Sequence, residues 1–451
     1  MTKLVFKKEN KWIYLIIMLS AMSIFSQLNF VFDILITLAF FAVAIILINK
    51  DEFVLIYAVL YVFMGRLMVY QGGVSLVNVF LLLYVARMIF KGERLKLNRY
   101  LLPILIMLFL HGFFVLFPAF NYNIIKLINY LASILLIFSL LNKLKDIELL
   151  RKFLITLSVS SIAACIYGIV NKNSYSFSET LNTGMLVSER FKGVSSDPNY
   201  MAITFLIGLL GIFALKNQNK LLSIALGFLL IYFILTTEST TALLCLILIL
   251  VIYLIMQRKP TNVMIVSFIS AIGIMMIIAN FNEIYGYLLQ SQNYASFASR
   301  VTGQINDIFQ HNNNDIASGR LVISVAYWKY FWEQNIFRIL FGGNMCGIYG
   351  MGKYVLTFLP GLYATHNTQL DILMSTGLIG WLIFSFLAIR SMINTWKMYF
   401  ANNEGIYKLL FMIKSVIMLF SFSLAFFPSW TILVFYLLDL KTNKSLGCDQ
   451  Y

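Results

Sequence analysis

Long apolar runs follow one another along this chain from Trp12 onward, separated by short polar stretches. Each run has about 15 to 20 residues, which is long enough, or nearly so, for a helix to cross the hydrocarbon core of a bilayer. The runs are continuous and lack a period of two, so they do not suit the strands of a membrane barrel. The pattern predicts an all-α fold, a polytopic transmembrane helical bundle with about 12–14 spans. The candidate spans are 12–28, 30–48, 53–70, 74–90, 101–118, 124–141, 153–170, 201–215, 221–236, 240–256, 262–281, 368–389, 408–426 and 429–439.

Two long polar stretches, near 171–200 and 282–367, interrupt the apolar pattern. They divide the chain into four parts. These are N-terminal transmembrane helices at 1–170, a motif-bearing outer loop with transmembrane helices at 171–281, one large extracytoplasmic loop at 282–367, and C-terminal transmembrane helices at 368–451. Inside the large loop, aromatic and apolar residues recur at helical spacing over 321–332, which predicts a helix lying on the membrane surface.

The basic residues set the predicted orientation. The chain is 60% hydrophobic and 12% charged, with a formal net charge of +15. Positive residues collect in cytoplasmic loops, so an inside N-terminus places every short basic loop on the cytoplasmic side and both long polar loops outside. The basic excess is then a topology signal and a contact with the lipid bilayer, and nucleic acid is disfavoured as a partner. We therefore expect a multi-pass cell-membrane protein whose candidate site faces outward.

The sequence lacks the motifs that several kinds of enzyme chemistry require. The four cysteines are scattered and give neither a disulfide framework nor a metal-ligand spacing. There is no Asp-x-Asp, no carboxylate cluster suited to a divalent cation, no Walker motif and no glycine fingerprint for nucleotides. No metal and no cofactor are expected, and both an ATPase and a metal-dependent nucleotide-sugar transferase are disfavoured.

The first candidate site lies in the outer loop near 171–200. Arg190 and Lys192 precede Pro198 and Asn199, where a helix is predicted to begin. A capped helix start with basic flanks explains these residues without any function. In the functional interpretation, Arg190 projects toward an anion, helped by the positive end of the following helix.

Two further candidates lie in and after the large outer loop. Arg320 follows Ser318-Gly319 directly before the predicted surface helix, where a lone arginine is usually just solvated. His366 and Asn367 stand at the start of the predicted helix 368–389. A lone histidine is more often structural, and His111 and His311 take that interpretation. His366 is preferred because its helix starts at the outer interface.

Taken together, the motifs resemble the O-antigen ligase and Wzy-type polysaccharide polymerase superfamily of bacterial envelopes. The resemblance covers about 190 to 390 and rests on the order, spacing and common outer side of the matching residues. These are Arg190, Gly193, Pro198 and Asn199; then Ser318, Gly319, Arg320 and Trp328; then His366, Asn367, Leu370, Gly377 and Gly380.

One departure from the family pattern concerns the turn between the predicted helices 221–236 and 240–256. The family often has Thr-x-Ser-Arg there, whereas this chain has Thr237-Glu238-Ser239-Thr240. Glu238 falls near the outer end of its helix and is a candidate contributor to an outward-facing polar cavity. A charge placed within a span, such as Lys414, is expected to pair with another group or to snorkel toward the interface.

The resemblance implies a donor glycan carried on undecaprenyl pyrophosphate in the outer leaflet. Arg190 and Arg320 would stabilise the departing pyrophosphate, because guanidinium groups bind phosphate bidentately. His366 would take the proton of the acceptor hydroxyl, or would only hydrogen-bond the pyrophosphate. Asn199, Lys192, Glu238 and Asn367 are expected to bind substrate. A flippase and chain-length regulator proteins are the further candidate partners.

Three functions fit this pattern. The first is a polymerase that joins repeat units of a cell-surface polysaccharide (O-antigen, capsule or exopolysaccharide). The second is a ligase that moves the glycan from the lipid carrier to another acceptor. The third is a flippase or transporter of lipid-linked sugars. A transporter concentrates polar features and broken helices near the bilayer midplane. Here the polar features gather at the outer surface, which favours an enzyme.

Overall fold

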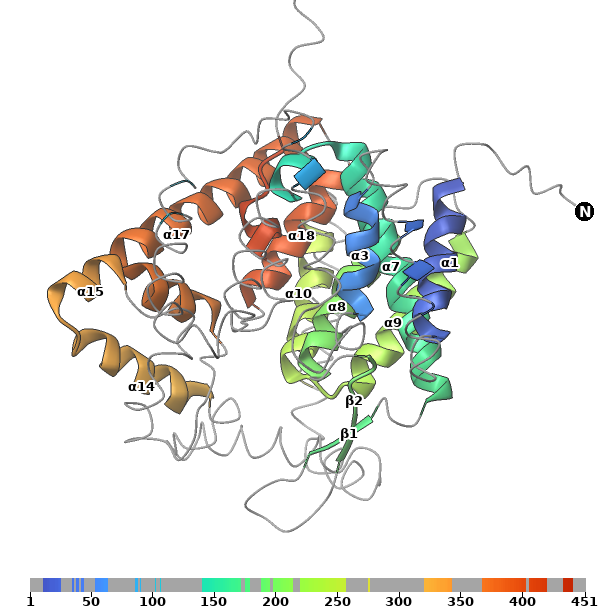
Figure 1. The fold of residues 1–451 in the computed structure, drawn as a ribbon, viewed down its shortest axis with the longest axis horizontal. Coiled ribbons are helices and arrows are strands. Elements are labelled where there is room, and N and C mark those ends of the chain that lie inside the picture. Colours follow the sequence, from blue (N-terminus) through green and yellow to red (C-terminus); the bar gives the residue numbers. More distant parts are fainter. Residues whose placement is uncertain are drawn as a thin grey trace, which may run out of the picture.

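The computed structural model describes helices, one short hairpin and the turns that join them. The described residues are 11–25, 53–63, 140–171, 175–178, 188–194, 198–213, 220–256, 320–342, 367–402, 405–419 and 433–440, with isolated residues at 35, 38–39, 42–43, 86–87, 90, 102, 106 and 275. The elements are α1 (Lys11–Phe25), α3 (Phe53–Phe63), α7 (Ile147–Val170), β1 (Tyr175–Ser178), β2 (Ser188–Phe191), α8 (Pro198–Ile212), α9 (Lys220–Thr236), α10 (Thr240–Ile255), α14 (Arg320–Trp332), α15 (Ile336–Phe341), α17 (Thr368–Asn402) and α18 (Gly405–Leu419) (Figure 1). The all-α prediction is confirmed for this part of the chain.

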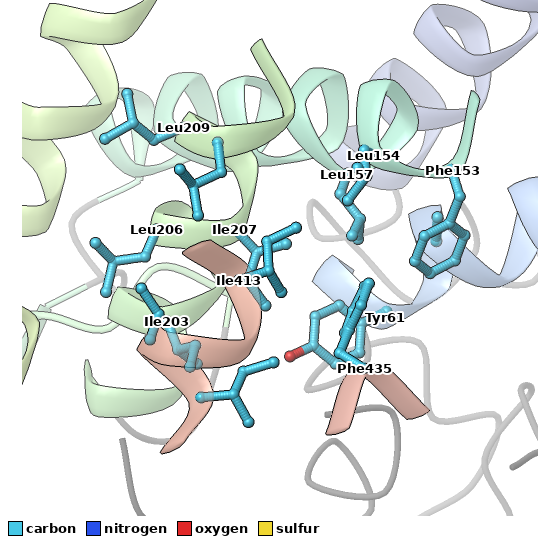
Figure 2. Close-up of a cluster of buried hydrophobic side chains, with 14 of the residues drawn as sticks. Tyr61, Phe153, Leu154, Leu157, Ile203, Leu206, Ile207, Leu209, Ile413 and Phe435 are labelled. Atoms are coloured by element: carbon cyan, nitrogen blue, oxygen red, sulfur yellow. The ribbon is translucent and has the colours of Figure 1, made fainter. Parts of the chain in front are cut away.

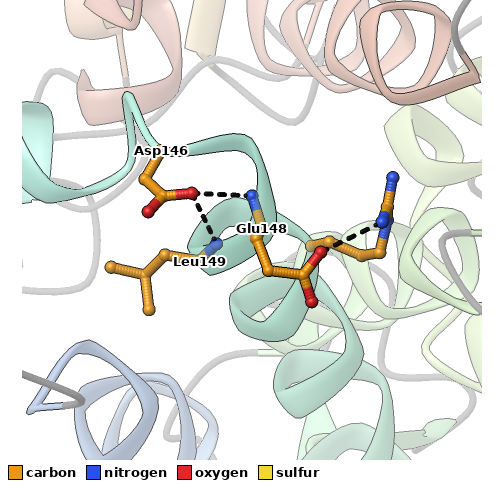
Figure 3. Close-up of polar contacts among 4 residues, drawn as sticks. Asp146, Glu148 and Leu149 are labelled. Atoms are coloured by element: carbon orange, nitrogen blue, oxygen red, sulfur yellow. Dashed lines mark hydrogen bonds and ion pairs between the residues drawn. The ribbon is translucent and has the colours of Figure 1, made fainter. Parts of the chain in front are cut away.

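Helix α7 is the centre of the N-terminal part and packs against α1, α3, α8 and α9. Its start is fixed by Asp146, whose carboxylate accepts hydrogen bonds from the backbone N–H of Glu148 (2.9 Å) and Leu149 (3.3 Å) (Figure 3). Such a cap satisfies two of the N–H groups that a helix start leaves without a partner. Glu148 also pairs with Arg151 at 3.1 Å on the helix surface. The capped helix runs for 24 residues.

Helices α7 and α8 approach each other closely because small residues line their contact. A Cβ added at Gly211 would lie 2.4 Å from the carbonyl oxygen of Leu154, so only glycine fits there. Ser158 donates to the carbonyl oxygen of Gly208 at 2.6 Å, across the same contact. Close approach over small residues, combined with hydrogen bonds between helices, is the usual way that helices associate in lipid.

The main hydrophobic core joins elements that lie far apart in the sequence. Figure 2 shows Tyr61 of α3, Phe153 of α7, Leu206 of α8 and Ile413 of α18 converging with Phe435 of the helical turn at 433–437. The rings of Phe153 and Phe435 are 6.1 Å apart. The C-terminal helices are therefore packed onto the N-terminal ones through one continuous core.

A second, smaller core lies under α14 and α15. Figure 1 shows these two helices beside the first part of α17 and apart from the group around α7. Tyr327, Tyr330 and Phe331 of α14 are buried against Leu370, Leu373 and Met374 of α17 in one cluster. The unit formed by α14, α15 and residues 368–376 is called the outer unit below.

Helix α17 is broken inside the outer unit. Gly377 has φ 67° and ψ −174°, which no α-helix contains, so a short helix at 368–376 is followed by a long one at 378–402. The predicted helix 368–389 is correct in its start but too short. It continues because the Trp396 ring packs against the Phe411 ring of α18, tilted and 4.8 Å away, and because the Tyr399 hydroxyl donates to the Met256 carbonyl.

The described residues contain helices suited to a membrane. By length and composition, α7 and α17 are long and apolar enough to cross one, and α8, α9 and α10 are shorter apolar helices. Helices α9 and α10 also expose many large apolar side chains. They include Leu221, Phe228, Tyr232 and Leu235 on α9, and Leu244, Ile247, Leu250 and Ile255 on α10. A soluble protein rarely exposes a continuous apolar surface of that kind.

Other predictions about the spans have mixed outcomes. The boundaries 221–236 and 240–256 agree with α9 and α10 to within one residue, and α7 begins six residues before the predicted 153. The predicted spans 30–48, 74–90, 101–118, 124–141 and 262–281 lie wholly or almost wholly outside the described residues. Of the two alternatives expected for Lys414, the structure shows pairing with other groups and not snorkelling, because its side chain is 1% exposed and donates to groups of α17 and of the 433–440 segment.

Candidate functional site

Arg190 is held by two groups from separate parts of the chain. Its Nε donates to the backbone carbonyl of Thr237 at 3.0 Å, and its Nη2 lies 3.4 Å from Oδ1 of Asn199. Arg190 sits in β2, which pairs antiparallel with β1 so that Arg190 faces Ser176. The two bonds fix the plane of a half-buried guanidinium at the junction of β2, α8 and the turn that links α9 to α10.

The residue after Arg190 fastens β2 to the core. Phe191 is fully buried, and its ring lies 4.8 Å from Phe233 of α9 and 6.0 Å from Phe205 of α8. On the third side is Gly168 of α7, where an added Cβ would lie 2.1 Å from the Phe191 ring. Three helices therefore close around one aromatic ring, and this anchor limits where Arg190 can lie.

The turn between α9 and α10 has an unusual backbone. Glu238 has φ 50°, the only positive value among the non-glycine residues that the structure describes. Its side chain is 6% exposed although it is a carboxylate. Ser239 then caps α10 by accepting a hydrogen bond from the N–H of Ala242 at 3.4 Å. Non-glycine residues in this region of φ are strained, and such strain gathers at functional sites.

The start of α8 completes this group. Helix α8 begins at Pro198, three residues before the predicted span 201–215, and Asn199 lies in its first turn. Lys192 is half-buried and follows the anchor Phe191. Gly193 has φ 57° and its Cα faces Met201, where an added Cβ would lie 3.1 Å from the sulfur. The chain thus turns sharply from β2 into α8, which keeps Arg190 and Asn199 adjacent.

The predicted residues of the third motif lie in the outer unit. Asn367 caps the short helix of α17, since its Oδ1 accepts from the N–H groups of Gln369 (3.0 Å) and Leu370 (3.3 Å). Trp381 donates through Nε1 to Oε1 of Gln369 at 2.9 Å and so ties the short helix to the long one. Arg320 is the first residue of α14. His366 lies outside the described residues.

A buried pair of acidic groups connects α14 to α17. Asp371 is fully buried in the first turn of α17, and Tyr327 of α14 is 2% exposed. Burial, reinforced by the Asp371 carboxylate, raises the pKa of Tyr327 to about 12. The phenol therefore stays protonated at physiological pH and remains a hydrogen-bond donor. Asp371 lies four positions after Asn367, about one helical turn, so the pair sits close below the start of α17.

Two glycines join α15 to the break in α17. Gly342 has φ 79°, and a Cβ there would lie 2.5 Å from the carbonyl oxygen of Ser375. Gly377 has φ 67°, and a Cβ there would lie 2.4 Å from the carbonyl oxygen of Leu340. Each glycine thus admits the backbone of the other element. This contact, called the glycine joint below, ties α15 to the break and thereby to the helix that begins after His366.

The sequence-predicted site residues therefore form two groups. The structure brings Arg190 and Asn199 together beside the turn that carries Glu238, with Lys192 two residues from Arg190. Arg320 and Asn367 belong to the outer unit. Within the described residues, no group of three or more His, Cys, Asp or Glu side chains could hold a metal ion. The meeting of both groups at one carrier phosphate stays a prediction.

Two residues of the first group escaped the sequence analysis. The Thr237 carbonyl is a main-chain group, and any residue can supply one, so no residue type points to it. Phe191 was detectable, because it is a large apolar residue within a polar, basic stretch. An isolated aromatic beside a candidate arginine indicates an anchor that holds the arginine in place.

These features define a helical membrane protein with an anchored arginine at the junction of a hairpin and two helices. Residues 225–385 match the family model described as O-antigen ligase. This region belongs to that family, and the predicted resemblance is confirmed. The match includes the 237–240 turn, α10, α14, α15 and the first part of α17, whereas Arg190, Lys192 and Asn199 precede it. Neither the curated proteins nor the solved structures gave a match.

The family gives the protein a general role. The match points to an O-antigen ligase-type membrane enzyme of the glycosyltransferase kind, and the family implies a lipid-linked glycan as substrate.

Proposed function

We propose that this protein polymerises the repeat units of a cell-surface polysaccharide carried on undecaprenyl pyrophosphate. The reaction would take place at the outer leaflet and would need no metal. The observation that carries the proposal is the anchoring of Arg190 on the carbonyl of Thr237, inside the region that matches the O-antigen ligase family. An arginine outside the matched region is thereby tied to the turn between α9 and α10, which lies inside that region.

The proposed reaction has one bond formed and one broken. The hydroxyl of the acceptor sugar attacks the anomeric carbon of the donor, and the bond from that carbon to pyrophosphate breaks. The electron pair leaves on the pyrophosphate, which Arg190 and Arg320 stabilise as charge develops. The proton of the attacking hydroxyl passes to His366. Because pyrophosphate is already a good leaving group, the protein mainly positions the reactants.

The geometry of Arg190 supports its role. A guanidinium held at Nε and Nη2 presents a fixed planar fork, and a fixed fork loses little entropy when it binds an anion. The half-buried position lowers the local dielectric and strengthens an interaction with phosphate. Asn199 orients the fork from the first turn of α8, whose positive end favours the same negative charge.

The geometry of the outer unit supports His366. Asn367 caps the short helix of α17, so the residue before it stands at a helix N-terminus, where the dipole favours a neutral imidazole. Trp381 and the glycine joint hold that short helix in place. A neutral imidazole in such a position is suited to accept a proton.

The test is glycan-length analysis in a deletion strain complemented with single variants. We expect Arg190→Ala, Arg320→Ala and His366→Ala to abolish polymer while the protein remains inserted and expressed. Lys at position 190 or 320 should rescue poorly, because the fork is lost. Arg390→Ala is the matched control, since Arg390 is an exposed arginine of α17 that lies outside both groups of candidate residues. Polymer of full length from the Arg190 or His366 variant would disprove the assigned roles.

A ligase is the second candidate, favoured by the description of the matching family. The two activities leave different products when the gene is deleted. Loss of a polymerase leaves single repeat units, whereas loss of a ligase leaves long chains on the carrier. Purified protein with lipid-linked substrate separates both from a flippase, because only an enzyme lengthens or transfers the glycan in detergent.

A further inference from the structure

The outer unit exposes aromatic and other apolar side chains on both α14 and α15. On α14, Val325 is 45% exposed, Trp328 47% and Trp332 49%, and Lys329 is exposed between them. These positions are separated by three and four residues, so they lie on one side of the helix. On α15, Ile336 and Phe337 are each 69% exposed, and Arg338 is exposed beside them. The set of these seven residues is called the aromatic face below.

The buried side of α14 determines which of its side chains are exposed. Tyr327, Tyr330 and Phe331 are buried against α17. The helix is therefore oriented by its own core, and it directs two tryptophans away from the protein. The exposed rings are ordered, because Trp328 and Trp332 pack edge to face at 5.6 Å, and Phe337 packs on Phe341 at 4.9 Å.

The chemistry of the aromatic face fits the headgroup region of a phospholipid bilayer. Tryptophan is enriched there because its ring is apolar while its N–H needs a polar partner. Lys329 and Arg338 add two cations beside the rings. Among the described residues 320–342, the one exposed carboxylate is Glu333, in the turn between α14 and α15. Cations beside apolar rings suit lipid phosphates, and long basic side chains can reach outward from buried stems.

The length of the helices excludes a membrane-spanning position. Helix α14 has 13 residues, and α15 has 6. A helix needs about 20 residues to cross the hydrocarbon core. We propose that the aromatic face seats the outer unit in the headgroup region of the outer leaflet, with α14 lying along the membrane surface.

This seating would have a consequence for the site. Arg320 begins α14, two turns before Trp328, so a helix held along the surface keeps the backbone of Arg320 at headgroup depth. The diphosphate of a lipid carrier lies at that depth. This consequence rests on the proposed function, whereas the seating rests on the exposed residues and their chemistry, and the choice of leaflet rests on the predicted orientation.

Fluorescence quenching in proteoliposomes tests the seating. The chain has six tryptophans, and Trp12, Trp381, Trp396 and Trp430 are replaced by Phe so that only Trp328 and Trp332 report. Lipids brominated near the glycerol backbone should quench strongly, lipids brominated near the terminal methyl weakly, and aqueous iodide little. Strong iodide quenching without lipid quenching would mean that the face lies in water. Quenching by neither would mean a protein cover. Strongest quenching by deep bromines would mean a buried helix. Each of these three outcomes overturns the proposal.

A second arm separates the seating from the function. In the wild-type background, Trp328→Gln/Trp332→Gln is compared with Trp328→Phe/Trp332→Phe, which keeps the apolar rings. We expect the Gln pair to raise the KM for lipid-linked substrate at least fivefold with kcat nearly unchanged, and the Phe pair to behave as wild type. Lipid quenching with unchanged KM in the Gln pair would keep the seating and remove its link to Arg320. Loss of activity from Arg320→Ala is measured separately, so a failure of the proposed function is distinguishable.

Discussion

Glu238 shows how a single residue can carry strain for a site. It adopts φ 50° with a carboxylate that is 6% exposed, next to the carbonyl that binds Arg190. An L-residue in the left-handed region costs roughly 1–2 kcal/mol relative to glycine. Two changes at this position separate the backbone effect from the side-chain effect, because both Ala and Gly lack the carboxylate.

We expect Glu238→Gly to be more stable than Glu238→Ala by about 1 kcal/mol, since only glycine is relaxed at this φ. Thermal unfolding of the purified variants in one detergent measures the difference. Equal stability would mean that the turn relaxes when the side chain is lost. Glu238→Gln keeps the shape, so full-length polymer from it would remove Glu238 from the substrate-binding residues.

Lys414 is a basic residue that is buried among the helices. Its ammonium donates to the Leu438 carbonyl (2.8 Å), Thr395 Oγ1 (2.8 Å) and the Ser391 carbonyl (3.0 Å), and so joins α18 to α17 and to the C-terminal segment. Asn394 binds the Asp439 carboxylate at 3.1 Å nearby. A buried ammonium with several strong acceptors stabilises the protein only while all partners are present.

We expect Lys414→Met to destabilise the protein by about 3 kcal/mol, because the carbonyls of Ser391 and Leu438 lose their donor. Lys408→Met is the matched control on the same helix. Lys408 lies over the Tyr253 ring at 3.6 Å, and loss of that contact should cost about 0.5–1 kcal/mol. Thermal unfolding measures both, and equal shifts would show that the enclosed network adds nothing.

At the scale of elements, the glycine joint governs how the outer unit meets the rest of α17. The backbones of Leu340–Gly342 and Ser375–Gly377 touch so closely that no Cβ fits at either glycine. The joint therefore transmits the position of α15 directly to the short helix that Asn367 caps. A small displacement here would move Asn367, and the helix start that it caps, relative to Arg190.

We expect Gly377→Ala and Gly342→Ala to reduce polymer formation at least tenfold while membrane insertion persists, because both the clash and the positive φ oppose the native backbone. Gly405→Ala, where an added Cβ meets nothing within 4 Å, should leave polymer length unchanged. Glycan-length analysis beside expression levels is the measurement. Normal polymer from Gly377→Ala would mean that the break does not position the site.

The same elements show which features a sequence can predict. Helix α14 and the start of α8 at Pro198 were predictable, because helical spacing and proline placement are local signals. The β1–β2 hairpin was not, since its strands of four residues are separated by a long connection that contains no two-residue turn pair such as Asn-Gly. The extension of α17 to Asn402 was not either, because it depends on packing against α18.

The residues of the candidate site were predictable from the sequence, whereas the contacts between them were not. Residue types and order identified Arg190 and Asn199, which the structure brings together. The partner of Arg190 at Thr237 was not predictable, because 47 residues separate them and the acceptor is a main-chain atom.

At the scale of the whole molecule, the predicted topology awaits a direct test, and the native cysteines provide one. Cys165 and Cys245 are buried. By the sequence prediction, Cys346 lies in the outer loop and Cys448 on the cytoplasmic side. We expect a membrane-impermeant maleimide to label Cys346 in intact cells and Cys448 only after permeabilisation. Single Cys→Ser variants assign the bands by mass spectrometry. Labelling of Cys448 in intact cells would invert the orientation and place the large loop inside.

The bond from Arg190 to the Thr237 carbonyl has a consequence for how this chain can diverge. Every amino acid has a backbone carbonyl oxygen, so substitutions at position 237 can accumulate without removing the hydrogen-bond acceptor of Arg190. A search for covarying positions would therefore not detect this contact, although it links the hairpin to the turn between α9 and α10.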